Sequence, residues 1–525
     1  MLQNRLEMLD RLIASRQLQQ AIDSGERLRV EFPDSIHVCL SLSEAYRQRG
    51  QFNAARECAA HAYQIESSNR FVCAQYARTL VPFADYKTIK ALLLQHESHQ
   101  FKTDWMEEMM GAAAASVDEW QLALTCYDRL LLAQPGHLHT RYMRGLALSV
   151  LGFREDAVAE FQNLISQNPG YGRAWWSLAD IDLSVIDEKH VRSLLASKQL
   201  PESEKVYLWQ VLGQLQQRAG HYDAAFESWG NANRIRREAL GNQQGRWNNM
   251  VNALLNQAES FSGTAASPSV EKPVFIVGLP RSGSTLVEQL ISNSGEVAAL
   301  GELRDMEVLI QKAMGLEPMP LPFGMDVSLA GGIVPEDIAH AYSQRARSRC
   351  PDGLFCDKNP ANFLFLGIIL RAFPNARIIH VYKHPMDACL GAFKHQFAAA
   401  APWSYSLDDI SHFYSVYHKM MNAWERLHPG RICHLSYEKL LQNTDKETQR
   451  VFSYCGLTWT NEVMDLTQKA RPVLSASANQ VREGVHARAL FAHKNFKIQL
   501  EPFRLALIER GLNPDVIWEI GVNDD

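Results

Sequence analysis

The chain has 525 residues, which is more than one ordinary hydrophobic core organises, so the length predicts at least two domains. Hydrophobic residues make up 46% and charged residues 21%, as in a globular protein, and the net charge of −5 argues against general binding to nucleic acids or membrane surfaces. The charged N-terminus and the lack of an apolar run near the roughly 18 residues of a membrane helix favour a cytoplasmic protein without a membrane anchor. The nine cysteines have neither C-x-x-C nor metal-type spacing, so we expect reduced thiols.

The first half of the chain contains an internal repeat of 34 residues. Alanines recur at this interval, and isoleucine and valine occupy the two remaining positions: Ala21, Ala55, Ile89, Ala123, Ala157, Val191 and Ala225. Prolines follow three of these positions by twelve residues, and glycines precede three of them by five: Pro33, Pro135 and Pro169; Gly50, Gly152 and Gly220. Small residues allow close helix contacts and proline stops a helix, so the pattern predicts stacked pairs of antiparallel helices.

These repeats resemble the tetratricopeptide repeat, with seven units over about residues 1–240. The resemblance implies a helical solenoid over residues 1–256 whose concave surface binds a protein or peptide. Four tryptophans either line such a groove or, as is more common, pack between helices: Trp105, Trp120, Trp175 and Trp176. A solenoid performs no chemistry itself, so the activity is expected further along the chain.

Residues 257–272 are rich in Ser, Ala and Gly and predict a linker before a domain over residues 273–525. The short apolar runs "PVFIVGL", "ARIIHVYKHP" and "RICHLSYEKL" follow it, separated by helical segments. This alternation predicts a parallel α/β sheet. The expected architecture is therefore an α-helical solenoid followed by a P-loop-like α/β domain.

The segment "FIVGLPRSGSTLVEQL", residues 275–290, predicts a strand, a tight loop and the start of a helix. Its loop lies at the carboxyl end of the strand, where such sheets bind ligands, and its backbone N–H groups form an anion site. The residues of this candidate phosphate loop are Pro280, Arg281, Ser282, Gly283, Ser284 and Thr285. An NTPase would have a lysine at position 284, but here the cation is Arg281. The loop therefore suits one terminal phosphate and not cleavage of a β–γ bond, with a glycine-rich turn that binds nothing as the alternative.

The stretch "GLPRSGSTL" resembles the 5′-phosphosulfate loop of sulfotransferases that use 3′-phosphoadenosine 5′-phosphosulfate (PAPS). The likeness covers about residues 273–505 and extends to "LGELRDM", "FCDKNPANFLFLGIILRAFPNARIIHVYKHPMDACL", "ICHLSYEKLLQN" and "SASANQVREGV". It is greatest for bacterial repeat-linked sulfotransferases and tyrosylprotein sulfotransferases. The resemblance implies that the catalytic residues are Arg281, Glu302, Lys358 and Ser477, and that Tyr437 lies beside the nucleotide.

The implied reaction moves a sulfuryl group from PAPS to a hydroxyl, with protein tyrosine as the leading acceptor. Glu302 would act as the general base, while Arg281 and Lys358 would neutralise charge on the sulfonate and the bridging oxygen. No metal is expected, because these protein cations take its place.

The sequence departs from the family at the 3′-phosphate of the donor. The family holds it with an arginine and, eight residues later, a serine; this chain has Lys383 and Gly391. Lysine keeps the charge but not the two-pronged geometry of arginine, and glycine has no hydroxyl. A later Gly-Arg-Trp stretch corresponds here to Phe491, Ala492 and His493, and the candidate substitutes are Lys394, Arg482 and Lys494. Two hypotheses follow: an active sulfotransferase, or a peptide-binding scaffold whose nucleotide domain no longer turns over.

Overall fold

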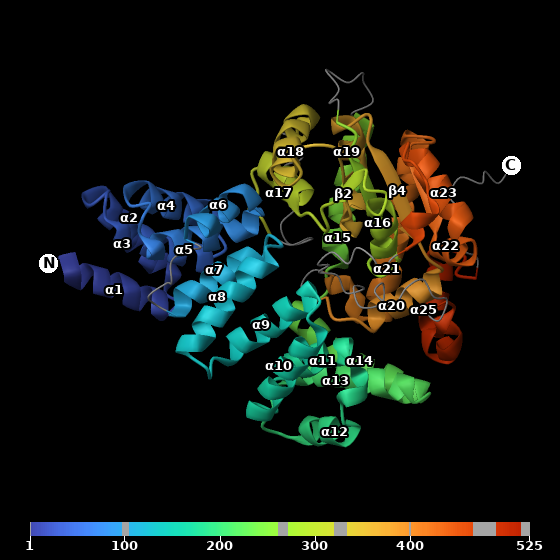
Figure 1. The fold of residues 1–525 in the computed structure, drawn as a ribbon, viewed down its shortest axis with the longest axis horizontal. Helices are drawn as coiled ribbons and strands as arrows, with labels where there is room; N and C mark the ends of the chain where they lie inside the picture. Colours follow the sequence, from blue (N-terminus) through green and yellow to red (C-terminus); the bar gives the residue numbers. More distant parts are fainter. Residues whose placement is uncertain are drawn as a thin grey trace. The chain divides into compact units, whose positions relative to one another are not determined.

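A computed structural model describes residues 2–96, 104–260, 271–319, 333–397, 401–465 and 490–515 (Figure 1). The chain forms two compact units. The first consists of Met1–Leu151 with Gly315–Met319, and the second of Gly152–Met314 with Pro320–Asp525. No helix within the described ranges combines the length and apolarity needed to cross a bilayer.

The first unit is a succession of helices in which sequence neighbours pack against each other, as α2 does with α3 and α3 with α4. These helices are α1 (Leu2–Ala14), α2 (Leu18–Glu31), α3 (Ile36–Gln48), α4 (Phe52–Ile65), α5 (Arg70–Leu80), α6 (Tyr86–His96), α7 (Asp104–Ala115), α8 (Trp120–Ala133) and α9 (Leu138–Leu151). The buried side chains of Leu9, Leu28 and Leu42 join the first three helices into one core. The predicted pairs of antiparallel helices are therefore present.

The 34-residue repeat reappears in the positions of the helices. The second helix of every pair begins 34 residues after the one before it, and the series continues into the second unit with α10 (Arg154–Gln167), α12 (Glu188–Ala196) and α14 (Tyr222–Leu240). The fourth residue of each such helix occupies the alanine position of the repeat, and all of them, including Ile89 and Val191, are at most 1% exposed. The small residue lies at the helix contact, as the sequence predicts.

The glycine of the repeat marks a left-handed turn between the two helices of a pair. Gly50, Gly152 and Gly220 have φ angles of 81°, 91° and 81°. Other repeats place non-glycine residues in the same conformation: Arg16, Ala84 and Asp118. Glycine is favoured there because it lacks the Cβ that makes this region costly.

The second unit starts with the later repeat helices α10, α11 (Gly172–Ile181), α12, α13 (Glu202–Arg218), α14 and α15 (Gln244–Ser260). Helices α14 and α15 pack on the α/β part of the same unit: Arg237 Nε lies 2.7 Å from Asp409 Oδ2, and the Trp247 and Phe413 rings are 4.7 Å apart. Helix α15 includes the first residues of the expected linker, 257–272, and residues 261–270 lie outside the described ranges. The domain boundaries at 256 and 273 stay a prediction.

The α/β part contains a five-stranded sheet in which all strands are parallel, in the order β2-β3-β1-β4-β5. The strands are β1 (Val274–Gly278), β2 (Val297–Ala299), β3 (Leu354–Asp357), β4 (Arg377–Tyr382) and β5 (Ile432–Ser436). The parallel sheet and the three predicted apolar strands, β1, β4 and β5, are confirmed. The two strands that the sequence did not indicate, β2 and β3, are only three and four residues long.

The helices of the α/β part surround this sheet, and helices pack on both of its faces. They are α16 (Ser284–Ser292), α17 (Asp305–Ala313), α18 (Pro335–Arg349), α19 (Leu366–Ala372), α20 (Pro385–Phe393), α21 (Leu407–Leu427), α22 (Tyr437–Gln442), α23 (Thr444–Cys455) and α25 (Lys497–Glu509). On one face Ile276, Val381 and Leu435 pack with side chains of α16, α22 and α23. On the other, Phe275 meets Tyr342 of α18. Burial on both faces explains why the strands read as continuous apolar runs.

Candidate active site at the carboxyl edge of the sheet

The predicted site residues that the structure describes cluster just after the ends of strands. The phosphate loop follows β1, Glu302 follows β2 within three residues, and Lys358, Lys383 and Tyr437 directly follow β3, β4 and β5. Parallel strands have their carboxyl ends at one edge, so the topology brings segments up to about 160 residues apart in the sequence to one place. Gly391 lies on α20, whereas Ser477 lies outside the described residues.

The phosphate loop is a tight turn that the rest of the site holds in place. Arg281 and Gly283 both have left-handed φ angles, 69° and 97°. A Cβ at Gly283 would lie 2.2 Å from Cδ2 of Tyr437, so the tyrosine ring rests directly on the loop backbone. No larger residue than glycine fits there without moving Tyr437.

The loop also presents polar groups that suit an oxyanion. The side chain of Ser282 is 2% exposed, and its hydroxyl makes no hydrogen bond within the part of the chain that the structure describes. Helix α16 begins immediately afterwards at Ser284, and no side chain caps its first turn. A buried hydroxyl without a partner next to a helix N-terminus is well suited to bind phosphate oxygens.

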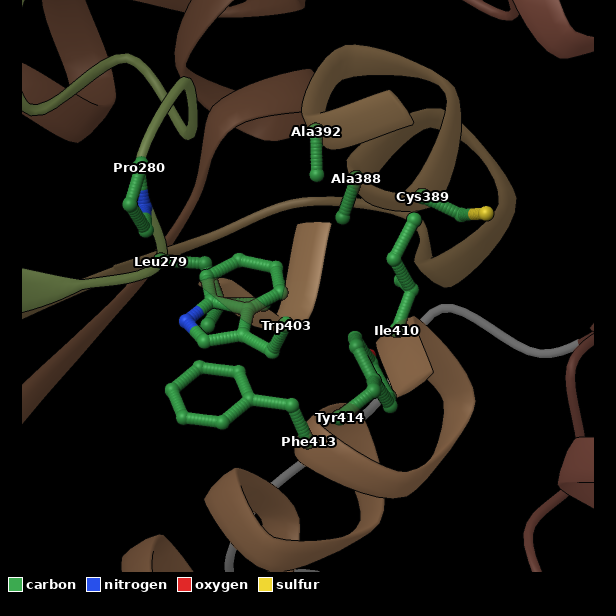
Figure 2. A pocket seen from close by; sticks show the side chains of 9 residues that line it. All are labelled: Leu279, Pro280, Ala388, Cys389, Ala392, Trp403, Ile410, Phe413 and Tyr414. Atoms are coloured by element: carbon green, nitrogen blue, oxygen red, sulfur yellow. The ribbon is translucent and has the colours of Figure 1, made fainter. Parts of the chain in front are cut away.

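Apolar side chains surround the start of the loop at Leu279 and Pro280 (Figure 2). Leu279 and Pro280 face a small cavity of about 10 Å³, between α20 and the stacked rings of Trp403 and Phe413, whose centroids are 4.1 Å apart. The remaining lining residues are Ala388, Cys389, Ala392, Ile410 and Tyr414. Such a volume is about that of one water-sized sphere, so this space is part of the core and not a ligand site.

Glu302 and Lys358 form an ion pair, with Nζ 2.5 Å from Oε1. The lysine is buried, while 47% of the Glu302 side chain is exposed. Burial acts to lower the pKa of Lys358, but Glu302 and the buried Glu288 of α16 outweigh it, so the pKa is raised. The backbone fixes the pair, because the Lys358 N–H donates to Gly301 O (2.9 Å). The pair combines a buried lysine, whose charged form the two acids favour, with a carboxylate that solvent can reach.

Lys383 and Gly391 both lie beside the phosphate loop. Lys383 Nζ is 5.0 Å from the ring centroid of Tyr437, and burial lowers the pKa of this lysine. A Cβ at Gly391 would lie 3.5 Å from Cβ of Arg281, which is ordinary contact. A Cβ would thus fit at position 391, so contact with Arg281 does not require glycine there.

The segment of Phe491, Ala492 and His493 is attached to the start of α20. The backbone N–H groups of Phe491 and His493 donate to the carboxylate of Asp387 at 2.8 and 2.9 Å. The ring of His493 stacks on that of His384, with centroids 4.5 Å apart. No local pattern indicates this arrangement, because it depends on contacts between residues more than 100 positions apart.

A repeat helix also contributes to the site, which the sequence reasoning missed. Asp180 of α11 and Arg281 interact electrostatically: burial lowers the pKa of Arg281, and Asp180 acts to raise it. One helical turn earlier, Trp176 contacts His395, with ring centroids 5.6 Å apart. Residues four apart lie on one helix face, so the same face of α11 presents Asp180 to Arg281 and Trp176 to His395. Nothing in the repeat pattern distinguishes these two positions.

The other repeat tryptophans pack between helices. Trp120 and Trp175 are 5% and 4% exposed, and Trp105 makes an edge-on contact with Phe71 at 4.7 Å. Among the described residues no group of three or more His, Cys, Asp or Glu side chains could hold a metal ion.

Residues 273–461 match the model of the sulfotransferase family. The C-terminal part of this chain is a sulfotransferase-family domain. The match contains the phosphate loop and every strand of the sheet, together with Glu302, Lys358 and Tyr437.

Two curated proteins resemble the chain. An uncharacterized protein of Aquifex aeolicus is 26% identical over 382 residues, which cover 70% of this chain and 50% of that protein. A protein of Caenorhabditis briggsae named "Putative protein-tyrosine sulfotransferase" is 21% identical over 234 residues, or 42% of this chain and 80% of that protein. The chain therefore matches only half of the Aquifex protein.

Solved structures resemble each half separately. A tetratricopeptide repeat protein from Parabacteroides merdae is 14% identical, covering 44% of this chain and 92% of its own, with a TM-score of 0.34. The sulfotransferase domain of the Synechococcus PCC 7002 olefin synthase is 16% identical, covering 45% and 96%, with a TM-score of 0.29. The helical repeats and the sulfotransferase domain were both expected from the sequence.

Proposed function

We propose that this protein transfers a sulfuryl group from PAPS to a hydroxyl group of a protein or peptide. The observation that supports this most directly is the Glu302–Lys358 pair, which lies at the same sheet edge as a phosphate loop containing Arg281. This edge combines an anion site, a buried cation and an accessible carboxylate, which are the groups that sulfuryl transfer needs.

In this proposal the phosphate loop binds the 5′-phosphosulfate. The unused hydroxyl of Ser282 and the N-terminus of α16 contact its oxygens, and Arg281 neutralises its charge. Tyr437 and Lys383, which lie beside the loop, are proposed to contact the nucleotide, as is Gly391 of α20, which lies next to Arg281.

The reaction follows from these positions. The acceptor oxygen attacks sulfur, its proton passes to Glu302, and the bond from sulfur to the bridging oxygen breaks with its electron pair on the 5′-phosphate. Lys358 and Arg281 stabilise the charge that develops there, and Ser477 is proposed to approach the sulfonate. General-base catalysis of this kind contributes about 10²–10⁴-fold in rate. When Lys358 turns towards the bridging oxygen, the Glu302 carboxylate is released to accept the proton.

The proposed acceptor is a tyrosine in a protein that the helical repeats recruit. The printed name of the Caenorhabditis briggsae relative and the repeat architecture support this choice. The second candidate is a peptide-binding scaffold without turnover, which the lysine at position 383 and the glycine at position 391 favour.

The test is transfer of radiolabelled sulfate from PAPS by the full-length protein to a tyrosine-containing peptide library, with the matching phenylalanine library as control. We expect label on the tyrosine peptides only, and equal rates with and without EDTA. Binding of 3′-phosphoadenosine 5′-phosphate without any transfer would favour the scaffold. Absence of both binding and transfer would refute the proposal.

A further inference from the structure

Three cations gather around the candidate nucleotide site, although two of the family's 3′-phosphate residues are replaced. They are Arg281 of the phosphate loop, Lys383 after β4 and Lys394 after α20. Burial and the charges of Arg281 and Lys383 lower the pKa of Lys394 to about 8. Burial is also the main cause of the lowered pKa values of Arg281 and Lys383. Enclosed like charges of this kind are stabilised when an anion binds among them.

The backbone of α20 places Lys394 next to the phosphate loop. Gly391 contacts Arg281, since a Cβ there would lie 3.5 Å from the Arg281 Cβ. Lys394 is the C-terminal cap of the same helix, three residues later and therefore on the same face. The glycine at position 391, which has no hydroxyl, thus lies one helical turn before a cation.

Repeat helix α14 fixes the position of Lys394. Its Asn233 donates to Phe393 O at 2.7 Å, and the amide of Gln396 donates back to Asn233 Oδ1 at 3.2 Å. Phe226 of α14 stacks on Phe393 with ring centroids 4.6 Å apart, and the Lys394 ammonium lies 6.0 Å from the Trp229 ring centroid. The chain is therefore anchored to α14 at Phe393, directly before the lysine, and at Gln396, two residues after it.

We infer that Lys394, held by α14, binds the second phosphate of the nucleotide, the group that distinguishes 3′-phosphoadenosine 5′-phosphate from adenosine 5′-phosphate. The inference rests on the proposed function, and it makes the helical repeats part of the donor site. Of the three candidate substitutes, Arg482 lies outside the described residues. Lys494 is exposed and lies 4.7 Å from the Phe491 ring centroid, whereas Lys394 is enclosed and feels the charges of Arg281 and Lys383.

The test is calorimetric titration of the full-length protein with 3′-phosphoadenosine 5′-phosphate and, separately, with adenosine 5′-phosphate. We expect the wild type to prefer the bisphosphate at least tenfold. Lys394→Gln should lower its affinity for the bisphosphate by tenfold or more and leave that for adenosine 5′-phosphate within twofold. Lys394→Arg, which keeps the charge, should retain most of the preference, and Asn233→Ala should lose part of it.

Several results would overturn the inference while leaving the proposed function intact. One is a Lys394→Gln variant that keeps the preference, and another is equal loss of affinity for both nucleotides. A loss of the preference in Lys494→Gln would assign the phosphate to that lysine instead. A wild type that binds neither nucleotide refutes the proposed function itself. If Lys394→Gln fails to fold, the Lys394→Arg and Asn233→Ala variants still decide the question.

Discussion

Replacing Glu302 by glutamine separates catalysis from stability in this protein. The change keeps the shape of the side chain and removes the carboxylate that accepts the proton in the proposed reaction. We expect turnover to fall by at least about a hundredfold, which corresponds to roughly 2.7 kcal/mol in the activation barrier.

The structure indicates that Glu302→Gln changes the free energy of unfolding much less than it changes the activation barrier. Nearly half of the Glu302 side chain is exposed, so water screens its ion pair with Lys358, and such pairs contribute about 1 kcal/mol or less. The buried lysine also keeps Glu288 as a second acidic neighbour. Glu302→Gln should therefore lower the melting temperature by only a few degrees.

The assay measures sulfate transfer at saturating PAPS, the affinity for 3′-phosphoadenosine 5′-phosphate and the melting temperature of each variant. Glu307→Gln is the matched control, because this acid on α17 is also ion-paired, to Arg304 at 3.6 Å, but has no proposed catalytic role. Lys358→Ala should also reduce turnover strongly, whereas Arg281→Ala should weaken nucleotide binding as well as rate. A Glu302→Gln protein with more than a third of wild-type turnover would refute the general-base assignment.

Three further predictions concern the loop, the buried histidines and the chain connection. Gly283→Ala should displace Tyr437 and weaken binding of 3′-phosphoadenosine 5′-phosphate about tenfold, measured by calorimetric titration. Gly295→Ala is the control: Gly295 has a similar φ of 74° but open space around it, so this change should leave the affinity for the nucleotide unchanged. His384 is 7% exposed, and burial and His493 lower its pKa to about 4; the unfolded chain therefore takes up the proton first, and stability should fall below about pH 6.5. Urea unfolding measures this as a decrease in the free energy of unfolding between pH 6.5 and 5. His384→Asn, whose side chain can still accept the Met386 N–H, should make that decrease smaller by about 2 kcal/mol. A decrease as large as in the wild type would contradict the prediction. Limited proteolysis should cut first between residues 262 and 270, with both fragments eluting together because α14 and α15 pack on α21; a first cut within residues 30–240 would count against the proposed boundaries.

The sequence by itself determined the repeat register, the phosphate loop and the three longer strands. Each of these follows from a local sequence pattern. The patterns are a small residue every 34 positions at a helix contact, glycines at left-handed turns, and apolar runs long enough to form strands buried on both faces. The roles of Arg281, Glu302, Lys358 and Ser477 came from the family resemblance and stay predictions.

Only the tertiary structure decided how distant segments meet. The order β2-β3-β1-β4-β5 places the ends of two very short strands side by side, which brings Glu302 to Lys358 across 56 residues of sequence. In the same way, the packing of α11 and α14 in the second unit brings Asp180 to Arg281 and anchors the chain on either side of Lys394. Such contacts arise from the burial of whole helix and sheet faces, and a buried face does not specify which polar residue at its margin meets which partner. Local periodicity therefore predicts the elements, whereas the neighbours of Glu302, Asp180 and Lys394 are fixed only when those elements pack.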